Sequence, residues 1–172
     1  MKKLQKRQYL MFIAGTLSLI AGVSVLSFLI FQKINREWNR QKLLKENSVI
    51  EIPEIKIKAP ILEGTDHEIL SKAAGHFIDT GTVGSGNYCI AGHSSIIYKE
   101  YFNNLKKVDI GMTVYLYDKA KTCYTYIVTE NFIVNPNETW ILDDFGDNRI
   151  TIITCTDDGT QRQVVVGMLN EN

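Results

Sequence analysis

Three side chains in this sequence have the chemistry needed for acyl transfer through a thiol: Cys155, Arg162 and His93. Cys155 follows the β-branched run Ile150–Thr154, and Arg162 begins a second run that holds three consecutive valines. Residues 156–160 between the two runs are typical of a turn. We therefore expect a hairpin that brings Cys155 close to Arg162. A fixed positive charge favours the thiolate, which is the reactive form of cysteine.

Each of these residues also has an ordinary structural interpretation. A cysteine at the end of a buried strand is commonly a small hydrophobe, and an arginine at the start of one is commonly solvated. His93 makes the chemical interpretation stronger, because Ala91 and Gly92 before it leave an imidazole room at the end of a short strand, Asn87–His93. In such a set, the cysteine attacks a carbonyl, the histidine moves the proton and the arginine holds the developing oxyanion.

The remaining histidines and cysteines are weaker candidates. His67 falls in the first turn of an acidic helix, where we expect solvent, and His76 falls in a glycine-rich loop as a packing or turn residue. Cys89 and His93 are four positions apart and suit zinc by type, but no second pair stands at ligand spacing. We interpret Cys89 as a small side chain packed in the core, and Cys123 as a residue of the hairpin. Three cysteines without paired spacing indicate no disulfide framework.

The charges are distributed unevenly along the 172 residues, although the formal net charge is zero. Residues 1–8 carry four bases and no acid, and residues 33–46 carry five bases against two acids. From Ser48 onward there are ten bases against seventeen acids, a net charge of −7. Phosphate binding needs a basic face, so this acidic region argues against a nucleic-acid partner.

The N-terminal part of the chain contains an apolar stretch that is long enough to cross a membrane. Twenty-five residues between Arg7 and Lys33 carry no charge, and residues 9–31 would span about 34 Å as a helix. A cleaved signal peptide is the alternative, but its apolar region should be shorter and should end in small residues. We therefore predict a retained anchor. The flanking bases are nearly balanced, so charge leaves the orientation open.

The rest of the chain predicts a mainly β domain with short helices. We expect a tail at residues 1–8, an anchor at 9–31, a helix-compatible stalk at 32–48 and a folded domain at 49–172. The domain begins with alternating strands bounded by prolines, and a capping-box pattern opens a short helix. The expected elements are strands at 49–52 and 55–58, a helix at 65–73, a glycine-rich loop at 75–86, a strand at 87–93, a helical turn at 98–105, a hairpin of 112–117 with 122–134, an acidic connection at 138–148 and the final hairpin. About eight short antiparallel strands favour a barrel or sandwich.

Three motifs in this order resemble the sortase family. Residues 151–155, Thr-Ile-Ile-Thr-Cys, are similar to its Thr-Leu-x-Thr-Cys signature, with Ile152 where leucine is usual. Arg162 before Gln-Val-Val-Val resembles the arginine that begins its last strand, and Ala91-Gly92-His93 resembles its histidine motif. The spacings Phe102-x-x-Leu105 and Val134-x-Pro136 also fit, and the likeness covers residues 49–172.

The resemblance implies an eight-stranded β-barrel behind one transmembrane helix. It implies a single-pass, membrane-anchored cysteine transpeptidase, with its catalytic domain outside a Gram-positive cell. Such an enzyme cleaves a Leu-Pro-x-Thr-Gly-like sorting signal after threonine. Cys155 would form the thioester, His93 would act as general acid and then base, and Arg162 would stabilise the oxyanion. An amine of peptidoglycan or its precursor would then resolve the thioester.

Departures from the family pattern bear on the subclass. Ser94 stands where arginine is common, Met112 where aspartate often follows glycine, and the turn between Cys155 and Arg162 is short. The sequence shows no second apolar run near residue 172, and residues 32–50 hold no aspartate for a lid, so the pilin-polymerising class fits poorly. Residues 137–148 are too few for the long helix of the class that resembles haem-uptake sortases. We therefore expect a class D-like enzyme, with a class A-like enzyme as the second choice.

Other functions remain open at this point. An L,D-transpeptidase would need a glycine before its cysteine, and Cys155 follows Thr154. A catalytically silent, membrane-tethered binding module would not need His93, Cys155 and Arg162 together. Asp143, Asp144 and Asp147 suggest a calcium-binding loop of the kind some sortases have, but they lack the alternating pattern of a dedicated site. We favour a solvated acidic turn there and expect no cofactor.

Overall fold

The computed structural model describes residues 2–94 and 101–170, with side chains from residue 8 onward. The chain divides into two compact units, Met1–Gln41 and Lys42–Asn172. Helix α1 runs from Lys2 to Glu46 without interruption. From Gln8 onward this helix is long and apolar enough to cross a membrane, by length and composition. The division into tail, anchor and stalk stays a prediction.

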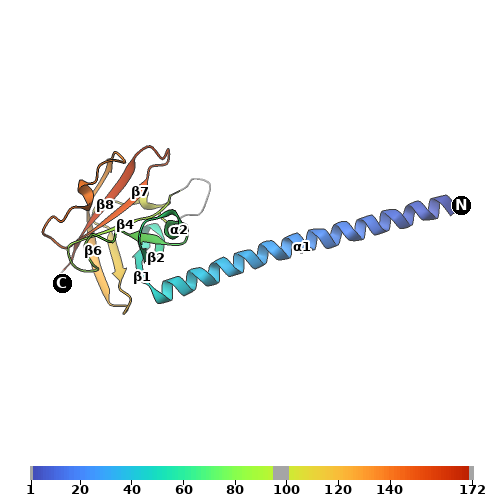
Figure 1. Cartoon of the computed structure of the whole chain (residues 1–172), viewed down its shortest axis with the longest axis horizontal. Helices are drawn as coiled ribbons and strands as arrows, with labels where there is room; N and C mark the ends of the chain where they lie inside the picture. The colour runs from blue at the N-terminus through green and yellow to red at the C-terminus, as the bar shows by residue number, and fades with distance from the viewer. Residues whose placement is uncertain (1, 95–100, 171–172) are drawn as a thin grey trace. The chain divides into compact units, whose positions relative to one another are not determined.

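Eight strands form a closed barrel in the order β1-β2-β3-β4-β7-β8-β6-β5 (Figure 1). This confirms the expected eight-stranded, mainly β fold with short helices. Closure leaves no unpaired sheet edge. The strands are β1 (Ser48–Ile52), β2 (Ile57–Glu63), β3 (Ala74–His76), β4 (Asn87–Ala91), β5 (Thr113–Tyr117), β6 (Cys123–Val134), β7 (Arg149–Cys155) and β8 (Arg162–Leu169).

Two neighbouring pairs in the barrel are parallel, so the expectation of antiparallel strands throughout was wrong. β2 pairs with β3, and β4 pairs with β7, in parallel ladders. A parallel pair needs a crossover connection rather than a tight turn. Helix α2 (His67–Leu70) lies in the first crossover, and the β5–β6 hairpin lies in the second. The second crossover matters for function because it places the end of β4 beside the end of β7.

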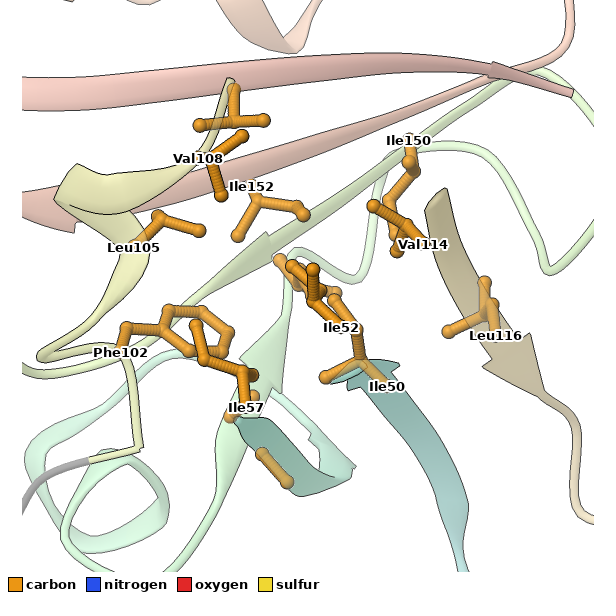
Figure 2. Close-up of a cluster of buried hydrophobic side chains, with 14 of the residues drawn as sticks. Ile50, Ile52, Ile57, Phe102, Leu105, Val108, Val114, Leu116, Ile150 and Ile152 are labelled. Atoms are coloured by element: carbon orange, nitrogen blue, oxygen red, sulfur yellow. The ribbon is translucent and has the colours of Figure 1, made fainter. Parts of the chain in front are cut away.

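Alternating side chains of the strands fill the barrel (Figure 2). Ile50 and Ile52 on β1 and Ile150 and Ile152 on β7 are fully buried there. Phe102 and Leu105 close the barrel from the connection after β4, and both are buried as expected. The part of the expected turn at residues 98–100 lies outside the described residues. A second cluster of buried hydrophobic side chains is separate from this core and consists of Val134, Ile141, Ile153, Val164 and Val166.

The local elements differ from expectation in several places. The strand expected at 55–58 is instead the end of a short 3-10 helix, η1 (Pro53–Ile55), and the start of β2 at Ile57. Asp66, not Thr65, caps α2, because the Asp66 carboxylate accepts from Ile69 N at 3.0 Å, and the helix is a single turn. Pro60 lies inside β2 rather than at its end. It is paired with Val49 of β1, and the β2–β3 ladder begins only at Ile61, so Pro60 itself has no paired residue on β3. The first residues of the expected loop form β3, which is too short to show alternation.

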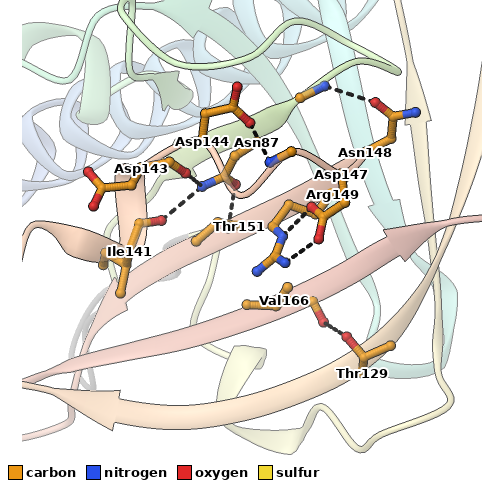
Figure 3. Close-up of polar contacts among 12 residues, drawn as sticks. Asn87, Thr129, Ile141, Asp143, Asp144, Asp147, Asn148, Arg149, Thr151 and Val166 are labelled. Carbon is orange, nitrogen blue, oxygen red and sulfur yellow. Dashed lines mark hydrogen bonds and ion pairs between the residues drawn. The ribbon is translucent and has the colours of Figure 1, made fainter.

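A buried amide ties the connection before β7 to the barrel (Figure 3). Asn87 Nδ2 donates to the carbonyl oxygens of Ile141 at 3.0 Å and Asp143 at 2.9 Å. Its Oδ1 accepts from Thr151 Oγ1 at 2.6 Å. Ile141 belongs to the short 3-10 helix η3 (Trp140–Leu142). All these polar groups are satisfied by one side chain, so the connection is fixed against both β4 and β7.

Candidate active site

Cys155 and Arg162 stand directly opposite each other in the β7–β8 ladder. Directly paired residues of an antiparallel ladder project from the same face of the sheet. The sequence produces this pairing because two β-branched runs flank a turn that closes on itself. Thr156 N donates to Gln161 O at 3.1 Å, and Gly159 N donates to Thr156 O at 2.8 Å.

His93 comes just after β4, at the end of the barrel where β7 ends in Cys155. The β4–β7 ladder ends at the pair Ala91 and Ile153, and His93 and Cys155 each come two residues after that pair in the sequence. The two chains stay together past the ladder, because Gly92 N donates to Ile153 O at 3.1 Å. Thr154 Oγ1 also donates to Gly92 O at 2.8 Å. The three candidate residues therefore occupy adjacent positions at the ends of β4 and β7 and the start of β8.

Ser94 and Phe102 hold the segment that carries His93. Ser94 Oγ donates to the carbonyl oxygen of Cys155 at 2.8 Å, and Phe102 N donates to the carbonyl oxygen of His93 at 3.3 Å. Sequence reasoning noted Ser94 only as a departure from the family pattern and missed this role. Its position directly after the histidine was the available signal.

The Arg162 guanidinium is held by its own turn. Nη1 donates to the carbonyl oxygens of Gln161 at 3.0 Å and Gly159 at 3.4 Å. Asp158 stiffens this turn, because its carboxylate accepts from Thr156 Oγ1 at 2.6 Å and Thr160 Oγ1 at 2.8 Å. These hydrogen bonds lower the pKa of Asp158 to about 2, and the bond from Thr156 has the largest effect. The turn thus presents an arginine at a defined place next to the thiol.

Cys155 opens into a cavity of about 380 Å³. The cavity is lined by residues from β6, β7, β8 and the segment after His93, which are Ser94, Phe102, Asn103, Lys106, Asn131, Phe132, Ile133, Thr154, Cys155, Thr156, Asp157 and Gln163. His93 and Arg162 are not among the residues that line this cavity, although Ser94 and Gln163, which follow them in the sequence, are. The thiol is therefore the member of the candidate set that faces the cavity.

The other two histidines have different surroundings. His67 is exposed, as expected, but its ring centroid lies 6.1 Å from that of His93. His76 is buried, with Nδ1 bonded to Glu63 Oε2 at 2.7 Å and its ring stacked on Tyr88 at 4.3 Å between centroids. This fits the expected packing role of His76. The proximity of His67 to His93 could not be read from the sequence, because it depends on the β2–β3 crossover.

The residues weighed as metal ligands have other partners. Burial raises the pKa of the Cys89 thiol to about 11, which disfavours the thiolate that a metal needs. Asp147 pairs with Arg149, and Asp144 Oδ1 accepts from Gly146 N at 2.9 Å (Figure 3). Across residues 8–94 and 101–170, no three His, Cys, Asp or Glu side chains gather at metal-binding geometry. All three cysteines are free thiols, and Cys123 is exposed at the start of β6.

A closed eight-stranded barrel with a thiol, an imidazole and a guanidinium at adjacent strand ends defines the class of fold and site. Residues 50–170 match the family model described as "Sortase domain". The chain belongs to the sortase family.

Named relatives agree with this assignment. The chain is 35% identical over 123 residues to sortase A of Streptococcus agalactiae, covering 68% of this chain and 49% of that protein. It is 32% identical over 122 residues to sortase A of Bacillus anthracis, covering 70% of this chain and 58% of that protein. The chain thus spans about half the length of these curated relatives. The structure of a Clostridium perfringens sortase D5 transpeptidase superposes with a TM-score of 0.65 at 30% identity, covering 78% of this chain and 88% of that one.

Proposed function

We propose that this protein is a membrane-anchored cysteine transpeptidase that cleaves a sorting signal and transfers the acyl fragment to a cell-wall amine. The observation that carries the proposal is the adjacency of Cys155, His93 and Arg162, with the thiol facing a cavity. Membership of the sortase family supports the same chemistry. A silent binding module would need the barrel and the cavity but not these three side chains together.

The proposed reaction uses one residue for each chemical need. The Cys155 thiolate attacks the carbonyl carbon of the threonine in a Leu-Pro-x-Thr-Gly-like signal, forming a tetrahedral intermediate. The Arg162 guanidinium donates to the oxyanion through N–H groups other than those of Nη1, whose bonds to the carbonyls of Gly159 and Gln161 hold the side chain on its turn. His93 protonates the leaving amine and later accepts a proton from the attacking amine. Hydrogen bonds of this kind often tighten only when substrate is bound.

The finer assignments are also proposals. We infer a class D-like enzyme, supported by the superposition on the sortase D5 structure, with class A as the second choice because of the sortase A relatives. We infer a single membrane crossing by α1, with the barrel outside the cell, from the apolar stretch and the family. The inferred partners are sorting-signal peptides and peptidoglycan or its precursor.

The test is the formation of an acyl-enzyme. The full-length protein in detergent is incubated with a panel of sorting-signal peptides, with and without an amine, and intact-protein mass is measured. We expect an acyl adduct on the wild type that disappears in Cys155→Ala, and release of a transpeptidation product when the amine is present. His93→Ala should lower the rate of adduct formation by about 10²–10⁴-fold.

Cys123→Ala provides a matched control, because Cys123 is an exposed thiol that does not line the cavity. It should form the adduct as the wild type does. If wild type and Cys155→Ala give the same masses across the whole panel, the transpeptidase proposal is wrong and a binding module becomes the better account.

A further inference from the structure

A lysine ammonium already sits in the candidate active-site cavity. Lys106, from the short 3-10 helix η2 (Leu105–Lys107), places its Nζ 2.7 Å from Asp157 Oδ2. Asp157 lies on the β7–β8 turn, two residues after Cys155. Both partners line the same cavity as the Cys155 thiol. The pair therefore holds a primary alkylammonium in the space next to the nucleophile.

Asp157 differs from the other carboxylate of this turn. Asp158 is fully used inside the turn, by Thr156 and Thr160. The hydrogen bond found for Asp157 in the described part of the chain goes to Lys106, on the other wall of the cavity. The side chains of Lys106 and Asp157 are 51% and 55% exposed to solvent, so water screens the charges of the pair. A screened pair of this kind adds little to stability and exchanges readily for another ammonium.

We propose that Asp157 binds the ammonium of the incoming acceptor amine, and that Lys106 occupies this position in the empty enzyme. The inference rests on the proposed function and names the acceptor class for the same site: a primary alkylammonium such as a lysine side chain. Lys106 is then a competitor that the acceptor displaces. Asp157 captures the acceptor beside the thioester and does not activate it, because a carboxylate favours the protonated amine.

The transfer step balances without any further reagent. The bound ammonium gives one proton to solvent and leaves Asp157 as a neutral amine. The nitrogen lone pair forms a bond to the thioester carbonyl carbon, and the C–S electron pair returns to Cys155 Sγ when the tetrahedral intermediate collapses. The nitrogen loses a second proton to His93. The products are an amide, the Cys155 thiolate and the protonated His93 that received the nitrogen's second proton, with no change of oxidation state.

The experiment measures how the acyl-enzyme partitions between amide and acid. Full-length protein in detergent is acylated with a sorting-signal peptide at neutral pH, with increasing Nα-acetyl-lysine amide, which is charged, or hydroxylamine, which is largely neutral. The readout is the nucleophile concentration at which half of the acyl-enzyme is converted to the amide, or to the hydroxamate when the nucleophile is hydroxylamine, rather than hydrolysed to the acid. This concentration does not depend on how fast the acyl-enzyme forms, because it reports only how the acyl-enzyme is divided between the two products.

We expect Asp157→Asn to raise this concentration about two- to fivefold for the lysine amide, and less for hydroxylamine. Lys106→Met should lower it for the lysine amide, because the competitor is gone. Asp157→Glu should restore most of the wild-type value. Lys107→Met is the matched control, because Lys107 lies on the same η2 but does not line the cavity.

Opposite signs for Lys106→Met and Asp157→Asn separate acceptor binding from a structural ion pair. If both substitutions raise the half-point, or if neither moves it, the proposal is overturned. An Asp157→Asn effect of equal size with both nucleophiles overturns it as well, because charge is then not recognised. If the wild type forms no acyl-enzyme, no partition exists; the proposed function fails, and this inference fails with it.

Discussion

The backbone of Gly92 packs directly against the ring of Phe102. A Cβ added at Gly92 would lie 2.5 Å from Phe102 Cδ2, a distance that real Cβ contacts do not reach. Phe102 is buried, and its N–H donates to the carbonyl of His93. The glycine before the histidine is thus required by packing against the Phe102 ring, and the backbone N–H of the same residue holds the segment that carries His93.

Gly92→Ala should therefore lower both activity and stability. We expect a loss of about 1–3 kcal/mol in unfolding free energy from overpacking. A shift of the His93 segment should lower kcat/KM by roughly 10- to 100-fold. Chemical denaturation and a peptide-cleavage assay measure the two effects. The double variant Gly92→Ala with Phe102→Leu should recover part of the activity, because the smaller side chain makes room; purely additive losses would contradict the packing explanation.

Replacing Arg162 should lower activity with little effect on folding, because among the described residues its side chain bonds only to its own exposed turn. Arg162→Ala removes the proposed oxyanion donor, and we expect kcat to fall by about 10²–10³-fold. Arg162→Lys keeps the charge but loses the planar donor group, so it should recover little. Steady-state kinetics with melting temperature as the control measure this. Full activity in Arg162→Lys would mean that charge alone is sufficient.

Asn87→Ala should be one of the more destabilising polar substitutions in the barrel. It leaves the carbonyls of Ile141 and Asp143 and the hydroxyl of Thr151 without their partner. We expect a loss of about 2–4 kcal/mol in unfolding free energy, measured by urea titration. Asn148→Ala removes a single bond, from Gly86 N to Asn148 Oδ1 at 3.1 Å, and should cost about 1 kcal/mol. Equal costs for the two variants would show that the buried network is not important.

Alkaline pH should destabilise the domain through Cys89. Burial raises the pKa of this thiol from 9.0 to about 11, so the unfolded chain loses the proton first. The contribution to stability is present below about pH 9 and is lost as the pH rises toward 11, with a total on the order of 2–3 kcal/mol. Unfolding free energies at several pH values should decline more steeply for wild type than for Cys89→Ala. Parallel pH curves for the two proteins would exclude this linkage.

Much of the barrel could be predicted from local signals. The strand runs around Ile150–Thr154 and the valine triplet of β8 are β-branched and bounded by turn residues, and the β5–β6 hairpin has clear alternation. The pairing of Cys155 with Arg162 follows from such a hairpin, because a short turn fixes the register. These elements depend on residues close together in the sequence.

The parallel pairings and the cavity contacts could not be predicted in the same way. Neither the β4–β7 ladder nor the proximity of His67 to His93 leaves a periodic pattern, because both depend on crossovers between distant segments. The position of Lys106 against Asp157 is of the same kind, since 51 residues separate them. The motif order suggested that His93 and Cys155 meet, but the resemblance carried that suggestion and the local sequence did not.

The parallel ladder between β4 and β7 has a consequence for the life of the newly made chain. Its paired residues are 62 positions apart, and β8 must still join before the arginine is in place. Long-range pairings of this kind form late and slowly. A chain synthesised from its N-terminus therefore carries His93 long before Cys155 and Arg162 are in place. Under the proposed function, the catalytic set is assembled only when the last hairpin docks, so the enzyme becomes active at the end of folding.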